Sequence, residues 1–265
     1  MSPKKTITKS TKGATPFERL MEAIRTEDVD TVRRLLLEGR IDLNQALHDG
    51  ETPLGRAAIF GNATMARLLL LAGADPNAPT MVDDDEKSPL MVVGGGDSLE
   101  VTRLLLLAGA DLHDKAGGHY ALDKAVTSLE EDDEESGQLV TLLLNAGADT
   151  ECRGALGWTP LITASRYGLP NIVRLLLARG ANVQAKSSNG NSPLHIAAKS
   201  GHVEVVRLLL DAKARETAKN AEKQTAADIA TGRAKAFFAK RQSNALVKAV
   251  STQKHATGTI KKKRL

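Results

Sequence analysis

The sequence predicts an all-α solenoid of about six stacked helix–turn–helix repeats and a capping half-repeat, spanning residues 16–232. Three observations carry this prediction: a segment that recurs about every 33 residues, a proline that opens most copies of it, and a leucine run that ends in a small turn. Because aromatic residues make up only 3% of the chain while alanine and leucine supply most of the apolar content, a strand-rich fold is disfavoured.

The recurring segment is recognised by its opening dipeptide, Pro-Leu or a degenerate equivalent of it. Successive copies are separated by 32 to 39 residues. They begin at Pro16-Phe17, Pro53-Leu54, Pro89-Leu90, Ala121-Leu122, Pro160-Leu161, Pro193-Leu194 and Ala226-Ala227. A period of this length is typical of an array in which each repeat packs on its neighbours.

Each repeat is expected to hold two short helices. A threonine or serine before the proline, as at Thr52 and Ser192, supplies a capping hydroxyl, and proline suits the first helical position. The second helix follows a glycine turn and carries the leucine run, which ends at a glycine suited to a left-handed C-cap. In the sixth repeat the apolar residues are too many for one stripe, so neighbouring repeats must cover that helix on both sides. They are Val203, Val205, Val206, Leu208, Leu209 and Leu210.

The segments TPLGRAA, SPLMVV, TPLITAS and SPLHIAA resemble the TPLHxA signature of ankyrin repeats, over residues 16–232. Only Pro193-Leu194-His195 keeps the histidine of that signature. The resemblance implies a curved solenoid of helix, turn, helix and hairpin-like finger, in which the His195 imidazole bridges backbone groups of neighbouring fingers. It also implies a protein that binds other proteins and is not an enzyme.

Two acidic insertions depart from the period. The finger between Gly73 and Pro89 has 16 residues, against 13 between Gly180 and Pro193, and it contains the run from Asp83 to Glu86. In the fourth repeat, six extra residues fall within LEEDDEE at 129–135. Both runs are interpreted as solvated loops that tolerate insertion, with a site for a basic partner or a metal as the alternative.

The third repeat contains Gly94, Gly95 and Gly96, where the sixth has Ala198, Lys199 and Ser200. A phosphate-binding loop would require a preceding strand and a Gly-Lys-Ser/Thr ending, and neither is present. A close backbone approach by a partner is the other functional interpretation. The glycines primarily predict a weakened helix end and a locally soft repeat, because each costs about 1 kcal/mol relative to alanine.

Catalytic signatures are weak. Cys152 has no second cysteine at a zinc-type spacing and is interpreted as a plain thiol. His113 and His119 flank a finger in which a metal or proton-transfer site, and hence a hydrolase, is the remaining enzymatic alternative. The sequence therefore predicts no enzyme and no cofactor.

The ankyrin resemblance implies that partners contact the finger residue before Thr-Pro and the two residues before the inter-helix glycine, on the concave face. Carried onto this chain, it assigns partner binding to Phe60, Trp158, Arg166, Tyr167, His119 and Lys199. Three of the seven aromatic residues fall in this set, and aromatic anchors beside arginine are typical of binding hot spots. The alternative is that Trp158 and Phe60 only pack on neighbouring fingers or helices.

The two ends of the chain are basic. Residues 1–15 carry four lysines and no acidic residue and are expected to be a disordered tail. Residues 233–265 are expected to form a basic capping helix, with Phe237 and Phe238 closing the stack, and a C-terminal tail. That tail ends in Lys261, Lys262, Lys263 and Arg264, which fit a nuclear-import signal, a contact for nucleic acid or anionic lipid, or a solubilising tail.

The predicted function is that of a non-enzymatic scaffold or adaptor that binds another protein through its concave face. The alternative is a nuclear or nucleic-acid-associated regulator that uses the basic C-terminal segment. An intracellular, cytoplasmic protein is expected, with the nucleus as the alternative, because the chain has one cysteine and an N-terminus without an apolar core. No stretch reaches the roughly 18 apolar residues of a membrane span, and a monomer is expected.

Overall fold

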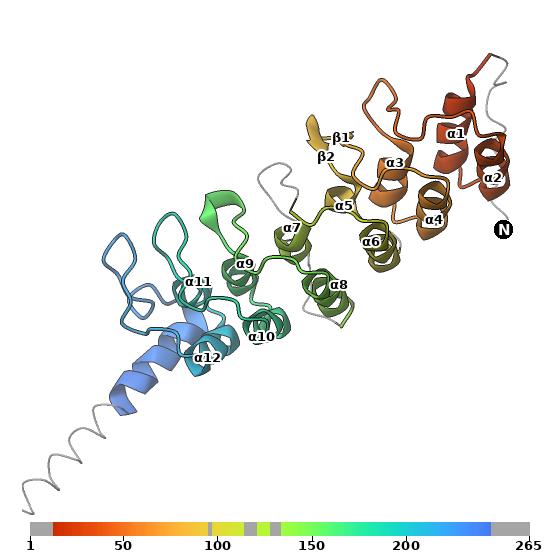
Figure 1. The fold of residues 1–265 in the computed structure, drawn as a ribbon. Helices are drawn as coiled ribbons and strands as arrows, with labels where there is room; N and C mark the ends of the chain where they lie inside the picture. Colours follow the sequence, from red (N-terminus) through yellow and green to blue (C-terminus); the bar gives the residue numbers. More distant parts are fainter. Residues whose placement is uncertain (1–12, 95–96, 114–120, 128–133, 245–265) are drawn as a thin grey trace, which may run out of the picture. The chain divides into compact units, whose positions relative to one another are not determined.

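The helices come in antiparallel pairs, in the order that the repeat pattern predicts (Figure 1). The computed structural model describes residues 13–94, 97–113, 121–127 and 134–244. The chain divides into an N-terminal unit, Met1–Ala121 with Asn145–Ala148, and a C-terminal unit, Leu122–Leu144 with Asp149–Leu265. Each unit is a stack of helix pairs, so the prediction of a helical-repeat fold is confirmed.

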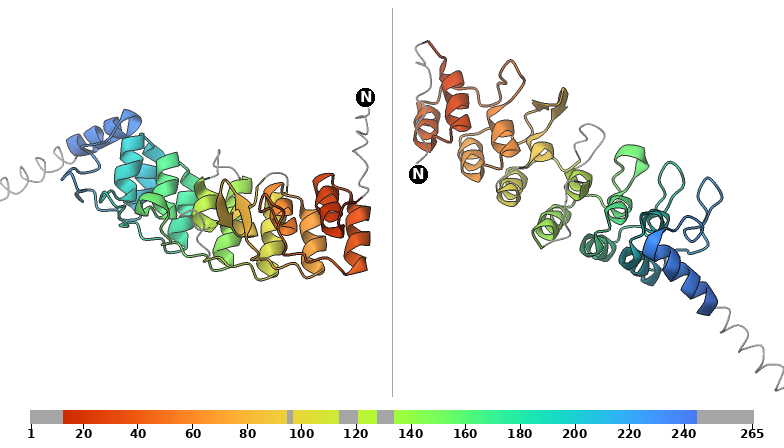
Figure 2. Two further views of the ribbon diagram at one scale, coloured as in Figure 1. Left: turned by 90° about the horizontal axis from the view of Figure 1, so that it is seen from above. Right: turned by 180° about the vertical axis from the view of Figure 1, so that it is seen from behind.

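In the N-terminal unit, α1, α3 and α5 form one row and α2, α4 and α6 form a second row (Figures 1 and 2). Its elements are α1 (Pro16–Arg25), α2 (Val29–Glu38), α3 (Pro53–Ile59), α4 (Ala63–Leu71), β1 (Thr80–Val82), β2 (Asp85–Lys87), α5 (Pro89–Val92) and α6 (Ser98–Leu107). The C-terminal unit contains α7 (Ala121–Thr127), α8 (Glu134–Asn145), the 3-10 turn η1 (Ala155–Gly157), α9 (Pro160–Tyr167), α10 (Pro170–Ala178), α11 (Pro193–Ser200) and α12 (Val203–Asp211).

A hydroxyl group caps most of the helices that begin with proline. The side chains of Thr15, Thr52, Thr159 and Ser192 each accept a hydrogen bond from a backbone N–H of the first turn. This satisfies one of the donors that a helix N-terminus leaves unpaired, and the proline after each cap has no N–H to satisfy. The predicted helix starts are therefore confirmed at these four positions.

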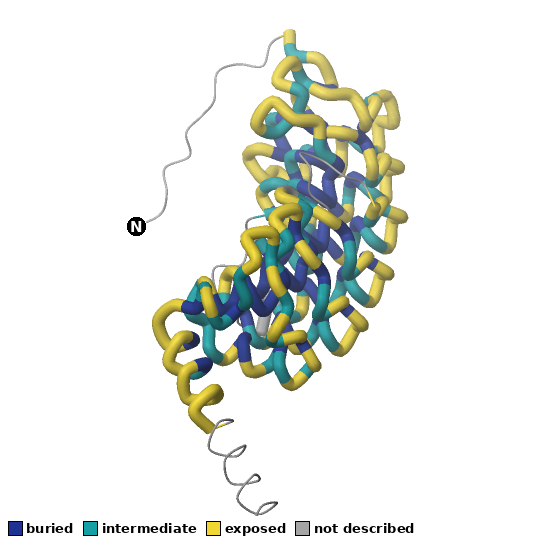
Figure 3. The backbone as a smooth tube through the Cα atoms, turned by 90° about the vertical axis from the view of Figure 1, so that its left-hand side faces the viewer, coloured by how far each residue is buried: buried dark blue, intermediate teal, exposed yellow. Residues whose placement is uncertain are grey.

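One leucine of each run is the residue that the stack buries. Leu35, Leu69, Leu105, Leu143, Leu176 and Leu209 are all at most 2% exposed. Figure 3 shows such buried positions, in dark blue, along the helix pairs of each unit.

The second helix of the sixth repeat packs against two neighbours, as the sequence predicts. Val205, Val206 and Leu209 are buried, and α12 contacts both its own partner α11 and the preceding second helix α10. The other apolar residues of this helix, Val203 and Leu208 among them, are only half-buried. Of the six apolar residues predicted to be covered, Val205, Val206 and Leu209 are the buried ones.

Fingers of successive repeats are joined by hydrogen bonds from a backbone N–H to a side-chain oxygen of the preceding finger. The Asp75 N–H donates to Asn44 Oδ1 at 2.9 Å, and the Asp111 N–H donates to Asn77 Oδ1 at 2.8 Å. In the C-terminal unit, the Asn182 N–H donates to Glu151 Oε1 at 2.8 Å. These contacts couple each repeat to its nearest neighbour, which is the source of stability in such arrays.

The acidic finger of the N-terminal unit forms a two-stranded hairpin, the only strand pair in the part of the chain that the structure describes. β1 and β2 are antiparallel, and Asp83 and Asp84 form a two-residue loop with positive φ at both positions. This is the backbone of a type I′ turn, for which aspartate is among the preferred residues. The strands are a local departure from the all-helical expectation, produced by the three extra residues of the finger.

The third repeat has a much shorter first helix than the sixth. α5 has four residues and α11 has eight; α5 ends at Val92, and its C-cap residue, Val93, directly precedes Gly94. Ser88, at its N-cap position, makes no side-chain capping bond. Gly95 and Gly96 lie outside the described residues. A shortened helix at this position agrees with the prediction of a weakened helix end.

We expect backbone amides to exchange faster across residues 90–94 than across residues 194–198. A four-residue helix with an uncapped start requires fewer contacts to break before its amides open than an eight-residue helix with a capping box. Hydrogen–deuterium exchange followed by mass spectrometry of peptides from both segments measures the difference. Equal protection of the two segments would contradict the softness of the third repeat.

A terminal helix covers the end of the C-terminal unit. At the seventh copy of the pattern, Ala226–Ala227, the chain makes a turn instead of a helix, and residues 232–244 are then helical. Phe238 is 2% exposed, whereas Phe237 lies at the edge, with its ring under the Arg207 guanidinium at 5.2 Å. Of the two predicted closing residues, Phe238 is thus the one that is buried.

Candidate functional site

The candidate site is the finger surface, which we define as the fingers together with the C-terminal ends of the first helices. In the C-terminal unit it is formed by the fingers before α9 and α11 and by the ends of these two neighbouring helices. Arg166, Tyr167 and Lys199 are exposed there, Tyr167 to 51%. The Arg166 guanidinium donates to Ser200 Oγ at 3.4 Å, which links the end of α9 to the end of α11.

Trp158 has a packing role that the sequence alone left open. Its ring is half-buried and lies against a small cluster formed by Ile162, Ala185 and Ile196. These residues come from α9, from the next finger and from α11, so the indole joins two repeats. Only part of this side chain remains available to a partner.

Leu156 is a candidate contact residue that the sequence analysis missed. It lies in the turn η1 with φ +59° and is 66% exposed, two residues before Trp158. Its carbonyl accepts from the Ser188 N–H at 3.0 Å and from Ser188 Oγ at 2.9 Å, which ties its backbone to the next finger. A non-glycine residue with positive φ is strained, and an apolar one displayed to solvent marks a functional candidate. Nothing in its sequence position signals the backbone conformation.

The predicted partner-binding residues are divided between the two units. Phe60 belongs to the N-terminal unit, where it is the C-cap residue of α3 and is 58% exposed, with the Arg56 guanidinium 5.9 Å from its ring centre. Arg56 is held in turn by an ion pair with Glu51 at 2.9 Å. Trp158, Arg166, Tyr167 and Lys199 all belong to the C-terminal unit. His119 and the basic run Lys261, Lys262, Lys263 and Arg264 lie outside the described residues.

His195 is structural, as the resemblance implies. It is fully buried, and its Nε2 donates to the carbonyl of Gln224 in the next finger at 3.1 Å. Its Nδ1 lies 2.7 Å from Ser192 Oγ and accepts from the Ser192 N–H at 3.3 Å. Gln224 offers only a carbonyl oxygen, so Nε2 carries the proton and the ring is neutral. Both ring nitrogens are used in holding two repeats together.

We expect the C-terminal unit to lose stability as the pH falls below about 6.5. Burial lowers the pKa of His195 below its ordinary value of 6.5. The unfolded chain therefore binds a proton before the folded chain does, so stability is complete above 6.5 and decreases as the pH falls toward the lower folded-state pKa. Urea unfolding at about pH 7.5 and about pH 5.5, followed by the fluorescence of the single tryptophan, Trp158, measures the effect. In a His195→Gln variant the decrease should be smaller, and an unchanged decrease would assign it to other groups.

Cys152 does not have the environment of a nucleophile. The thiol is buried, and this burial raises its pKa to about 12, with the nearby Asp123 carboxylate adding to the effect. A thiol protonated at neutral pH is a poor nucleophile and a poor metal ligand. His113 is exposed, and Asp114, Lys115 and His119 of the same finger lie outside the described residues. Within the described part of the chain, no group of three His, Cys, Asp or Glu side chains could hold a metal ion.

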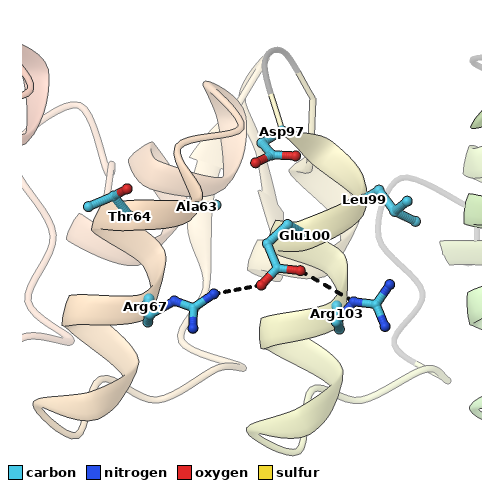
Figure 4. Close-up of a pocket in the computed structure, with 7 residues that line it drawn as sticks. All are labelled: Ala63, Thr64, Arg67, Asp97, Leu99, Glu100 and Arg103. Atoms are coloured by element: carbon cyan, nitrogen blue, oxygen red, sulfur yellow. Dashed lines mark hydrogen bonds and ion pairs between the residues drawn. The ribbon is translucent and has the colours of Figure 1, made fainter.

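An open pocket of about 460 Å³ lies between α4 and α6 in the N-terminal unit (Figure 4). Glu100 projects between two arginines: Arg67 donates to Glu100 Oε1 at 2.7 Å, and Arg103 Nε is 3.3 Å from Oε2. Of the described residues that line the pocket, none is a histidine or a cysteine. Its chemistry is that of a charged surface groove and offers no nucleophile activated by a base.

Stacked helix pairs joined by fingers define a helical-repeat protein. The family model for ankyrin repeats, in three copies, matches residues 7–80 and 130–221, which is more than half of the chain. The chain therefore belongs to the ankyrin-repeat family. Ankyrin repeats are generally modules of protein–protein interaction, and their fold is typically non-enzymatic.

Curated relatives match only part of this chain. The mitochondrial disaggregase of Bos taurus is 33% identical over 148 residues, 54% of this chain and 20% of that protein. The ankyrin repeat and KH domain-containing protein mask of Drosophila melanogaster is 35% identical over 104 residues, 37% of this chain and 2% of that protein. The human ankyrin repeat and SOCS box protein 3 is 35% identical over 120 residues, 45% and 22% respectively. The chain thus spans less than a quarter of the length of each of these relatives.

Solved structures of ankyrin domains match over most of their length. The ankyrin repeat domain of Bcl-3, described as a unique member of the IkappaB protein family, is 31% identical with a TM-score of 0.70, covering 83% of this chain and 96% of that domain. The ankyrin repeat domain of human ASB11 is 25% identical with a TM-score of 0.66, covering 81% and 92%. Among the described residues, no helix is both long and apolar enough to cross a membrane.

Proposed function

We propose that the protein is a non-enzymatic adaptor whose finger surface in the C-terminal unit binds another protein. The carrying observation is that a largely exposed Tyr167, beside Arg166, lies in the same unit as a strained, exposed Leu156. Of these residues, tyrosine and arginine are types that are enriched in binding hot spots, and the leucine adds apolar contact area. Lys199 extends the surface at the end of α11.

The folded core supports this surface without the partner. The Arg166 carbonyl accepts from His202 Nε2 at 3.1 Å, and Trp158 fixes the finger that carries Leu156. Anchors that are held in place before binding lose less conformational freedom on binding. Phe60, with Arg56 beside it, would supply a second contact from the N-terminal unit.

The proposal is tested with a partner captured from cell extract, identified, purified and titrated by calorimetry. Combining Tyr167→Ala with Leu156→Ser is expected to weaken binding by about 2 kcal/mol or more, which is roughly 30-fold. Both side chains are exposed, so the fold should persist, and Trp158 fluorescence during urea unfolding verifies this. Arg174→Gln is the matched control, because Arg174 is an exposed residue of α10 outside the finger surface.

Unchanged affinity of the Tyr167→Ala and Leu156→Ser double variant would remove the finger surface of the C-terminal unit from the proposal. Loss of affinity in the Arg174→Gln control would place the contact on the second helices of the repeats, such as α10, instead. Phe60→Ala, measured separately, determines whether the N-terminal unit takes part.

A second candidate function rests on charge. Residues 213–265 carry fourteen basic and three acidic residues, whereas residues 16–212 have a net charge of −11. In this candidate the basic segment from 233 onward contacts nucleic acid, and the protein acts in the nucleus as well as the cytoplasm. Two results would favour this candidate: the logarithm of the affinity for a DNA or RNA duplex falls linearly with the logarithm of the salt concentration, and binding is lost when residues 233–265 are removed.

A further inference from the structure

Three leucines at one position of the repeat are almost fully exposed in the N-terminal unit. Leu37, Leu71 and Leu107 each lie two residues before the glycine that follows the second helix, and they are 88%, 79% and 79% exposed. In the later repeats the same position holds Asn145, Ala178 and Asp211. The repeat therefore does not require leucine here. Among these positions, an exposed leucine is found on α2, α4 and α6, all in the N-terminal unit.

The three leucines form a row. They are carried by α2, α4 and α6, which are packed side by side, α2 on α4 and α4 on α6 (Figure 1). Large apolar side chains that recur on adjacent elements, with none of the unit's own described residues covering them, mark an interaction surface more often than isolated exposed residues do. We call Leu37, Leu71 and Leu107 the leucine row.

An arginine row runs beside the leucine row. Arg33, Arg67 and Arg103 each lie four residues before a leucine of the row, which places each pair on one face of its helix, one turn apart. Arg33 is exposed, and the side chains of Arg67 and Arg103 are 56% and 52% exposed. The ion pairs of Glu100 with Arg67 and Arg103 align these two guanidinium groups across α4 and α6 (Figure 4). One carboxylate between two arginines leaves N–H donors and net positive charge for a partner.

We propose that the leucine and arginine rows dock an acidic amphipathic helix of another protein. Neighbouring helices pack about 8–10 Å apart, and a helix rises about 1.5 Å per residue. A helix lying across α2, α4 and α6 therefore advances by about five to seven residues from one leucine to the next, and at the wider spacing an apolar side chain in every heptad meets the whole row. Acidic residues beside that stripe face the arginines.

Charge argues against this chain's own ends as the occupant. Residues 1–15 carry four lysines and no acidic residue, and residues 213–265 have a net charge of +11. Neither segment complements the arginine row. The occupant is thus a helix from another protein, bound on a different surface from the one proposed for the adaptor function.

The test uses a synthetic peptide of about 21 residues, three heptads with leucine in the apolar stripe and glutamate beside it. Fluorescence anisotropy measures its Kd for the full chain. Replacing all three leucines of the row by serine is expected to weaken binding at least tenfold, and Arg33→Gln with Arg67→Gln and Arg103→Gln should do the same and reduce the salt dependence. A peptide with lysine in place of glutamate should bind at least tenfold more weakly to the unchanged protein.

The matched control is Arg174→Gln, which removes the exposed arginine at the equivalent repeat position in α10 of the other unit and should leave the Kd unchanged. Circular dichroism confirms that the substituted chains stay helical. Equal affinity of the peptide for the leucine-substituted and unchanged proteins, or failure to bind either, would overturn the proposal. So would leucine-dependent binding to phosphatidylserine vesicles without peptide binding, or a dimer in sedimentation equilibrium that the leucine substitutions abolish, because the occupant would then be a membrane or a second copy.

Discussion

Replacing Leu176 by alanine is expected to lower the free energy of unfolding of the C-terminal unit by about 2–5 kcal/mol. Leu176 is fully buried in the middle of α10, which packs against α9 of its own repeat and α12 of the next. Removal of its side chain leaves a cavity that two repeats share. Because the stability of a stacked array is approximately a sum of repeat and interface contributions, this one substitution weakens an internal interface as well as the repeat itself.

Urea unfolding followed by Trp158 fluorescence measures this loss, since the indole packs on α9 and α11 on either side of the affected interface. The matched control is Leu177→Ala, at the next position of the same helix, where the side chain is only half-buried. The control should show a clearly smaller decrease. A decrease of less than about 1 kcal/mol for Leu176→Ala would mean that the leucine does not fill the interface as its burial indicates.

The register of the helices could be predicted because the same local rules recur in every repeat. A capping hydroxyl and proline at Thr159-Pro160 start the helix at Pro160, and a left-handed glycine ends it at Gly168. Local chemistry and long-range packing favour the same structure at these positions, which is why sequence reasoning succeeds there.

The details of the fingers could not be predicted, because they depend on contacts about 30 residues apart in the chain. Leu156 has a positive φ, and its carbonyl accepts a hydrogen bond from Ser188 in the next finger. Trp158 occupies a position where the family displays side chains to partners, yet its ring packs on Ala185 and Ile196. The exposure of Leu37, Leu71 and Leu107 could not be predicted from the leucine runs, because each run contains both buried and exposed leucines.

Thr80 accepts a hydrogen bond in the second repeat that the signature histidine accepts in the sixth. Thr80 comes from the following finger, whereas the histidine belongs to the repeat itself. Gly55 stands in the second repeat where His195 stands in the sixth. A Cβ on Gly55 would overlap the Cβ and Oγ1 of Thr80, which is fully buried. Thr80 Oγ1 accepts from the Thr52 N–H at 3.2 Å, just as His195 Nδ1 accepts from the Ser192 N–H at 3.3 Å. The N–H before the helix proline is therefore satisfied in both repeats, in the sixth by a side chain of the repeat itself and in the second by a side chain of the following finger.

This exchange predicts strong coupling between positions 55 and 80. Gly55→His alone is expected to destabilise the N-terminal unit by about 3 kcal/mol, because the imidazole and Thr80 require the same space. Thr80→Ala alone should cost about 1–3 kcal/mol, because the buried Thr52 N–H loses its acceptor. In the double variant the imidazole can enter the vacated space and accept from Thr52, so the combined loss should be at least about 1 kcal/mol smaller than the sum of the two single losses.

The coupling is measured by a double-mutant cycle in urea, with circular dichroism reporting on unfolding because Trp158 lies in the other unit. Gly55→Leu, alone and with Thr80→Ala, is the matched control: leucine also fills the space but has no nitrogen to accept from Thr52. Relief of overlap alone would give equal coupling energies for leucine and histidine. A larger coupling for histidine isolates the hydrogen bond, and additive losses in both cycles would show that position 55 and Thr80 do not substitute for one another across the interface.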